Sequence, residues 1–260
     1  MKKDQHIESA KRTLDIESKE LFRLSKNIGK DFSRLCKELL SCKGRIITIG
    51  VGKSGYIANK VSATLSSTGS PSYYIHASEA LHGDLGAISN KDSVLIFSYS
   101  GESQEIINAL PSLANIGCDI FSITGHKESS IAKKTKLNIS TEVKKEACPM
   151  DLAPTSSTTA SLALGDALAI ALFEAKKFSP KDFAKSHPGG KLGKRLLLKV
   201  EDLMHKGKDL PKVTPQTFLS QALLEISNKG LGIVIIMENS KKLRGVFTDG
   251  DLRRCLQSKA

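Results

Sequence analysis

Tryptophan is absent from the 260 residues, and aromatic side chains of all kinds make up only 5% of the chain. Proteins that bind single-stranded nucleic acid stack bases on aromatic side chains, so this composition offers few stacking platforms. The formal net charge of +12 is not concentrated in one segment, because Lys and Arg are spread along the chain among acidic residues. We therefore predict no nucleic-acid partner and a lysine-rich surface that attracts anionic substrates.

Paired cysteines and long apolar runs are missing as well. The five cysteines are scattered and show no C-x-x-C spacing, which predicts free thiols in a reducing cytoplasm. No apolar run approaches the length of a membrane span, and the start Met1-Lys-Lys-Asp4 is unlike a signal peptide. We expect a cytoplasmic protein with no membrane partner.

Strand-like and helix-like patterns alternate between residues 41 and 185. Strand-like runs occur at 45–49, 73–76, 93–100, 118–124 and 137–143, and helical patterns at 55–67, 103–116, 127–135 and 155–176. This alternation predicts a parallel sheet with helices on both faces. The expected fold class is therefore α/β, a five-stranded parallel, doubly wound, flavodoxin-like sheet with the strand order 2-1-3-4-5.

Three further segments flank this domain. Residues 1–40 show the spacing of one or two long amphipathic helices. Residues 186–201 begin with a Pro/Gly-rich hinge, and residues 202–260 predict a small α+β module. A module of this size buries little core alone, so we expect it to pair with another copy.

The loop Gly50-Val-Gly-Lys-Ser-Gly55 follows the first strand and opens a helix, an arrangement that binds phosphate. A Walker loop is excluded, because Ile47 stands where that motif needs glycine. The glycines match a dinucleotide fingerprint, but the end of the next strand, at 72–76, lacks the acidic residue that would hold the ribose. A sugar-phosphate site is favoured, with an ordinary turn as the alternative.

A second loop, Ser98-Tyr-Ser-Gly-Glu-Ser103, is again small, hydroxyl-rich and followed by a helix. In the order 2-1-3-4-5, strands one and three are neighbours whose crossovers leave in opposite directions. Ligands bind at such a point, beyond the carboxyl ends of the strands. The two loops together predict one site for a phosphorylated ligand.

Several motifs of this chain resemble a known family. Those that resemble the sugar isomerase (SIS) domain are Gly52-Lys-Ser-Gly55, Ser100-Gly-Glu-Ser103 and Ala153-Pro-Thr-Ser-Ser-Thr-Thr-Ala160. Three more narrow the resemblance to the D-arabinose 5-phosphate isomerases of Gram-negative bacteria: His82-Gly-Asp-Leu-Gly86, Lys145-Glu-Ala-Cys-Pro149 and Ser186-His-Pro-Gly-Gly190. Residues 202–205 and 245–254 are similar to a cystathionine-β-synthase (CBS) repeat.

This resemblance implies an isomerase that interconverts D-arabinose 5-phosphate and D-ribulose 5-phosphate through an enediol, toward 3-deoxy-D-manno-octulosonate (Kdo) for lipopolysaccharide. It implies no required cofactor, and a homotetramer with shared sites. The family carries two CBS repeats where this sequence shows one, so either the module pairs between subunits or the chain is shortened. Because a CBS nucleotide site usually needs a paired cleft, a lone repeat argues against nucleotide binding.

The resemblance also implies site residues. The catalytic set is Lys53, Glu105, Glu146 and His187, and the substrate-binding set is Ser54, Gly69, Ser70, His82, Ser98, Ser100, Ser103, Asn108, Glu142 and Lys144. His76 matches a family position linked to zinc. No ligand cluster with recognisable spacing surrounds it, so we expect zinc there to be inhibitory or incidental.

The chemistry gives these residue types a reason. Moving a proton between C1 and C2 needs a base near C2 and hydrogen-bonding or positive groups on the oxyanion. Two carboxylates divide acid and base work when their pKa values differ, and the sequence leaves the choice between Glu105 and Glu146 open. Each residue alone also has an explanation without a ligand. Glu105 would place a favourable negative charge in the first turn of a helix, and Lys53 would be an ordinary exposed lysine.

Two other functions are compatible with parts of the sequence. A non-catalytic SIS sensor of sugar phosphates would need a helix-turn-helix for DNA, and residues 1–40 show no turn glycine at a suitable place. A phosphoheptose isomerase would share the sheet, but the motifs at 82–86 and 186–190 and the CBS-like tail argue against it. The isomerase hypothesis is therefore preferred, with the sensor as the alternative.

Overall fold

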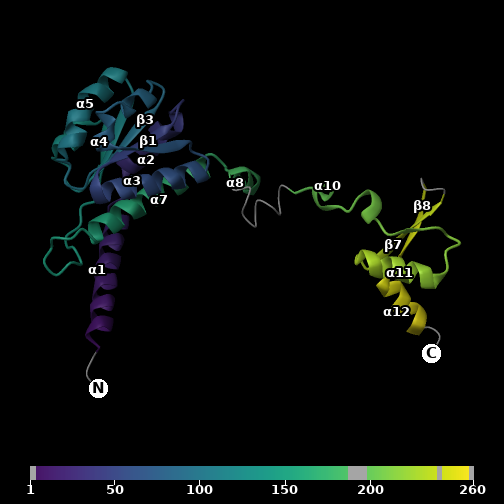
Figure 1. The fold of residues 1–260 in the computed structure, drawn as a ribbon. Coiled ribbons are helices and arrows are strands. Elements are labelled where there is room, and N and C mark those ends of the chain that lie inside the picture. Colours follow the sequence, from purple (N-terminus) through teal and green to yellow (C-terminus); the bar gives the residue numbers. More distant parts are fainter. Residues whose placement is uncertain (1–3, 187–197, 239–241, 258–260) are drawn as a thin grey trace. The chain divides into compact units, whose positions relative to one another are not determined.

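The structure is a computed structural model that describes residues 4–186, 198–238 and 242–257 (Figure 1). The chain divides into two compact units, residues 1–197 and 198–260. The first unit contains a five-stranded sheet and the second a three-stranded sheet. The predicted hinge at 186–201 lies mostly outside the described residues.

All strands of the first sheet are parallel, and their order is β2-β1-β3-β4-β5. The predicted fold class and strand order are therefore confirmed, with the change of winding direction between β1 and β3. The strands are β1 (Ile46–Gly50), β2 (Ser72–His76), β3 (Ser93–Phe97), β4 (Asp119–Thr124) and β5 (Leu137–Ser140).

Helices cover both faces of this sheet. One face packs against α1 (Gln5–Asn27), α2 (Lys30–Ser41), α3 (Gly52–Ser67) and α7 (Ser156–Ala175). The other packs against α4 (Ala77–Ala80), α5 (Gln104–Ile116) and α6 (Ser130–Lys134). The 3₁₀ turn η1 (Asp84–Ala87) precedes β3, and α8 (Pro180–Ser186) follows α7.

Strand β1, which lies between β2 and β3, shows why buried parallel strands have unbroken apolar sequences. Its successive side chains alternate between the two faces, so Ile47 and Ile49 join one core while Ile46 joins the other. Thr48 is fully buried between them, and its hydroxyl donates to the carbonyl of Ala58 in α3 at 2.9 Å. That hydrogen bond satisfies the one polar side chain of the strand.

Two predicted segments differ from the structure. The N-terminal segment forms two helices, α1 and α2, within the one or two that were expected, and the break between them at Gly29, the N-cap of α2, was not predicted. The last strand ends at Ser140 rather than 143, because after Thr141 the chain turns toward α1. The short elements α4, η1 and α8 were not predicted, since segments of four to seven residues are too short to show a helical period.

Helix α7 is, among the described residues, the one helix long and apolar enough to cross a membrane, with a mean hydropathy of 1.3. The expectation that no apolar run approaches the length of a membrane span was therefore wrong for this helix. Core helices have the same composition, and α7 packs against α1, α2 and α3. Leu164, Leu168 and Leu172 lie in the core of the sheet. The packing of α7 in the core of the first unit therefore explains why its sequence is apolar.

The second unit is the predicted small α+β module. Strand β7 (Ile233–Glu238) pairs in parallel with β6 (Lys212–Val213) and antiparallel with β8 (Lys242–Thr248). Its helices are α10 (Val200–Leu203), η2 (Gly207–Asp209), α11 (Leu219–Lys229) and α12 (Asp249–Gln257). The buried core consists of Ala222, Ile226 and Val234, while Phe218 is 76% exposed. Pairing with another copy stays a prediction.

The close packing of α7 on α3 gives a test of the fold. A Cβ on Gly165 of α7 would lie 2.3 Å from Cγ2 of Val61 in α3. We expect Gly165→Val to lower the free energy of unfolding by about 3 kcal/mol through overpacking. Urea unfolding followed by circular dichroism measures this. Ala167→Val, at an exposed position of the same helix, is expected to cost only about 0.5 kcal/mol; equal costs would contradict the packing.

Candidate active site

The carboxyl edge of the first sheet gathers the loops that the sequence singled out. Gly50, the last residue of β1, lies opposite His76 of β2 and Phe97 of β3. The chain continues from these strand ends into α3, α4 and the loop before α5. The predicted meeting of the 50–55 and 98–103 loops at neighbouring strand ends is therefore observed.

The first loop leaves backbone N–H groups open to a ligand. Gly52 has φ of +57°, which glycine adopts without strain, and a Cβ there would meet no atom within 4 Å. No side chain caps the N-terminus of α3. Lys53 is exposed and Ser54 half-buried in the first turn. This helix start offers N–H groups and one mobile cation to an anion.

His76 borders this loop on the side of β2. A cavity of about 160 Å³ is lined by Gly52, Gly55, Tyr56, Asn59, Tyr74 and His76. The Tyr74 hydroxyl donates to the carbonyl of Gly50 at 3.0 Å, and Nδ1 of His76 accepts from the N–H of Ser78 at 3.3 Å. Among the described residues no group of three or more His, Cys, Asp or Glu side chains forms a metal site.

The second loop is held by its own hydroxyls. The Oγ atoms of Ser98 and Ser103 are 2.9 Å apart, and Oγ of Ser100 accepts from the N–H of Glu102 at 3.2 Å. Ser103 is the N-cap of α5, and its side chain does not cap the helix. Glu105 is half-buried in the first turn, and Asn108 is exposed one turn later. The start of α5 is thus a second uncapped helix end.

Glu102 points away from that helix end. Its Oε1 accepts from the N–H of Ser130 in α6 at 2.8 Å. Hydrogen bonds from Ser130 lower the pKa of Glu102, and the carboxylate is therefore ionised at neutral pH. Because this charge caps α6, it does not occupy the first turn of α5.

Glu146 has a different environment, at the N-terminus of α7. Its Oε2 accepts from the N–H of Thr155 at 2.8 Å, the hydroxyl of Thr155 at 2.9 Å and the N–H of Ser157 at 3.3 Å. Partial burial opposes ionisation, but the hydrogen bonds from Ser157 and Thr155 outweigh it and hold the pKa of Glu146 below its ordinary value. The carboxylate is therefore ionised and fixed in orientation.

A cavity of about 280 Å³ lies beside Glu146. Its lining residues are Tyr99, Val143, Lys144, Lys145, Glu146, Asp151, Leu152, Pro154 and Ser157. Tyr99 comes from the loop after β3, and its hydroxyl accepts from the N–H of Val143 at 3.2 Å. Burial raises the pKa of Tyr99, and the charges of Glu146 and Glu142 raise it further, so the phenol is neutral. Tyr99 links the two loops that surround this cavity.

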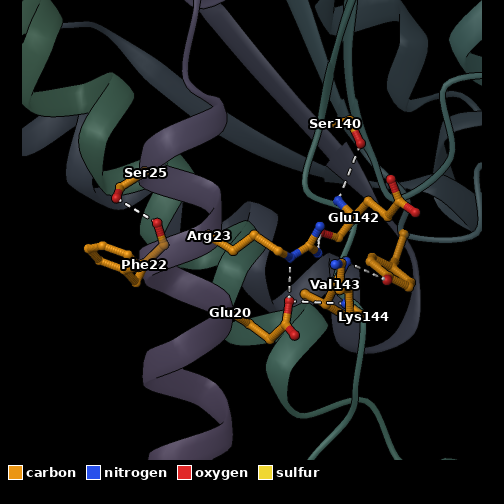
Figure 2. A network of polar contacts seen from close by, with 9 residues as sticks. Glu20, Phe22, Arg23, Ser25, Ser140, Glu142, Val143 and Lys144 are labelled. Atoms are coloured by element: carbon orange, nitrogen blue, oxygen red, sulfur yellow. Dashed lines mark hydrogen bonds and ion pairs between the residues drawn. The ribbon is translucent and has the colours of Figure 1, made fainter.

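Helix α1 holds the loop after β5 (Figure 2). Oε2 of Glu20 accepts from Nε of Arg23 at 2.9 Å and from the N–H of Lys144 at 3.0 Å. Arg23 in turn donates through Nη2 to the carbonyl of Glu142. Glu20 is only 8% exposed, so this small network is shielded from water. The expected site residues Glu142 and Lys144 are therefore positioned through their backbone atoms, while their side chains are exposed.

Four expected site residues remain to be placed, namely His82, Gly69, Ser70 and His187. His82 is exposed in the turn after α4. Gly69 and Ser70 precede β2 and so lie at the amino edge of the sheet, opposite the loops. Nζ of Lys176 donates to the carbonyl of Gly69 at 3.0 Å and to Oγ of Ser70 at 2.8 Å. Within one chain these two residues do not join the site, and His187 lies outside the described residues.

Comparison with known proteins decides the family. The SIS domain model matches residues 39–171, and the CBS domain model matches residues 200–258. Arabinose 5-phosphate isomerase KdsD of Pseudomonas aeruginosa is 52% identical over 250 residues, which cover 96% of this chain and 77% of that protein. This chain belongs to the SIS-domain family of arabinose 5-phosphate isomerases.

Two further relatives agree. The KdsD protein of Escherichia coli K12 is 47% identical over 95% of this chain and 75% of its own length. The solved structure of the E. coli CFT073 protein c3406 in complex with arabinose 5-phosphate has a TM-score of 0.70 and 42% identity, covering 72% of this chain and 100% of that one. The family resemblance drawn from the motifs is therefore confirmed, for the SIS and the CBS parts.

Sequence reasoning missed four residues that shape the site. Tyr99 and Thr155 lie inside motifs that were recognised, and the signal that could have selected Thr155 is its hydroxyl at the predicted start of the helix at 155–176. Glu20 and Arg23 gave no sign of a role in the site, since their partners in the loop after β5 are more than a hundred residues away.

The role of Glu20 can be tested by hydrogen exchange. Glu20→Ala removes the acceptor of the Lys144 N–H, and losing a hydrogen bond to a charged group is expected to speed exchange of that amide about tenfold or more. Exchange of residues 142–146, followed by NMR or mass spectrometry, measures this. Glu8→Ala, at an exposed position of the same helix, serves as control. Equal exchange in the two variants would show that α1 does not hold the loop.

Proposed function

We propose that this protein is an aldose–ketose isomerase that interconverts D-arabinose 5-phosphate and D-ribulose 5-phosphate. The observation that carries the proposal is the ionised Glu146 carboxylate, held by three hydrogen bonds beside a cavity at the carboxyl edge of the sheet. The names of relatives at about half identity support the same reaction. They favour an enzyme over a sensor of sugar phosphates.

The phosphate group binds at the uncapped helix starts. α3 and α5 leave their first N–H groups without side-chain caps, and the hydroxyls of Ser98, Ser100 and Ser103 surround the start of α5. The start of α7 is already filled by Glu146, so it does not compete for the substrate's charge. This division keeps the phosphate dianion away from the carboxylate that must accept a proton.

Glu146 is the base in this mechanism. Its free oxygen takes the proton from C2, and the electrons of the broken C–H bond form the C1–C2 double bond of the enediol. Return of the proton to C1 gives the ketose, so the protons balance without an oxidant. Lys53 stabilises the developing oxyanion, while Glu105, His82 and His187 assist in ring opening and in moving protons between the two oxygens.

The proposal includes the wider setting that the family implies. The reaction leads toward Kdo for lipopolysaccharide, requires no cofactor and takes place in the cytoplasm, and zinc at His76 would inhibit. The active form is a homotetramer with shared sites. The exposed apolar side chains Tyr56, Met150 and Leu152, at 78%, 72% and 77% exposure, lie at or beside the two cavities and support coverage by another chain.

A turnover assay with a matched pair of variants tests this function. Wild-type protein is expected to convert arabinose 5-phosphate to ribulose 5-phosphate without added metal. Glu146→Gln is expected to lower kcat by about 100-fold to 10,000-fold, the range for loss of a general base, while phosphosugar binding by calorimetry persists. Glu174→Gln, at an exposed position of α7, should leave kcat unchanged.

The outcomes separate the hypotheses. A wild-type protein that binds the phosphosugar without turning it over would favour the sensor. Full activity of Glu146→Gln in an active enzyme would exclude Glu146 as the base and leave Glu105 for that role.

A further inference from the structure

Thr155 contacts the Glu146 carboxylate twice, through its backbone N–H and through its hydroxyl. We propose that Thr155 is a positioning residue that holds Oε2 of Glu146, so that Oε1 faces the substrate as the reacting oxygen. This inference rests on the proposed function, because it assigns a role to Thr155 in the same proton transfer. Thr155 itself touches no reacting atom.

The hydrogen-bond directions around Thr155 follow from its neighbours. The N–H of Ala147 donates to Oγ1 of Thr155 at 2.8 Å, which leaves the hydroxyl proton for Glu146. The Thr155 hydroxyl therefore contacts both the backbone of Ala147 and the side chain of Glu146. The three hydrogen bonds from Thr155 and from the N–H of Ser157 all end on Oε2. The buried hydroxyl of Ser157 also lowers the pKa of Glu146.

The use of Thr155 is unusual for its position in the helix. A threonine at the N-cap normally turns its hydroxyl oxygen toward the N–H groups of the first turn. Here the side chain of Thr155 makes no such cap, and the carboxylate of Glu146 takes its place on the N–H of Ser157. The hydroxyl is thus directed at the carboxylate rather than at the helix.

Several other titratable side chains face the cavity beside Glu146. The other titratable side chains that line it are Tyr99 from the loop after β3, Lys144 and Lys145 from the loop after β5, and Asp151 from the turn before α7. A base works only when ionised, so activity is lost as pH falls through its pKa. Hydrogen bonds to the carboxylate lower that pKa, and removing one raises it.

Three variants of the full chain test the role of Thr155. Thr155→Val keeps the shape but removes the hydroxyl, and should lower kcat about tenfold to 100-fold with little change in KM. In the pH profile of kcat/KM, it should also shift the acid limb to higher pH by roughly one unit. Thr155→Ser, which restores the hydroxyl, should return both toward wild type. Thr158→Val is the control, because the Thr158 hydroxyl donates only to the carbonyls of Pro154 and Thr155.

A direct titration keeps this test independent of turnover. ¹³C NMR of labelled glutamate, with the Glu146 signal assigned by its loss in Glu146→Gln, should show a higher pKa in Thr155→Val than in wild type. An unchanged pKa and an unchanged acid limb would overturn the role of Thr155. Absence of wild-type turnover would instead overturn the proposed function, and the titration would still report on the contact.

Discussion

The parallel arrangement of the strands is the constraint on which the rest of the structure depends. Because every crossover returns the chain to the same edge, all strands of the first sheet end at one side, and α3, α5 and α7 begin there. Each helix start carries partial positive charge and unpaired N–H groups. One edge of the sheet therefore attracts anions before any charged side chain is considered.

The three helix starts are used in two ways. Those of α3 and α5 have no side-chain cap and stay open to an external anion. That of α7 binds an anion of the chain itself, Glu146, whose pKa is lowered as a result. The same physical feature thus provides two uncapped helix starts, the phosphate site of the proposed function, and a fixed, ionised carboxylate. In the proposed mechanism, the lowered pKa makes Glu146 a weaker base, and proton transfer from carbon still proceeds when the surroundings stabilise the enediolate.

The sequence predicted the sheet well because its strands are short apolar runs bounded by glycine-rich or polar loops. The meeting of the two loops followed from strand order alone. The contribution of α1 did not, since Glu20 and Lys144 are 124 residues apart and their contact depends on how α1 packs against α7. Thr155 lay in a recognised motif, but its hydroxyl direction is fixed only by the folded loop at 146–155.

For Gly69 and Ser70, the family resemblance and the topology of the sheet point in different directions. The resemblance implies that they bind substrate, but they lie at the amino edge of the sheet, opposite the loops of the candidate site. A strand of five residues spans about 16 Å, and β2 separates Ser70 from the carboxyl edge. Ser70 is 1% exposed, and its hydroxyl is bound by Lys176, whose pKa is lowered by burial. Neither residue reaches the loops at 50–55 and 98–103 of its own chain. A role for them in substrate binding therefore requires a second chain, as in the shared sites of the proposed tetramer.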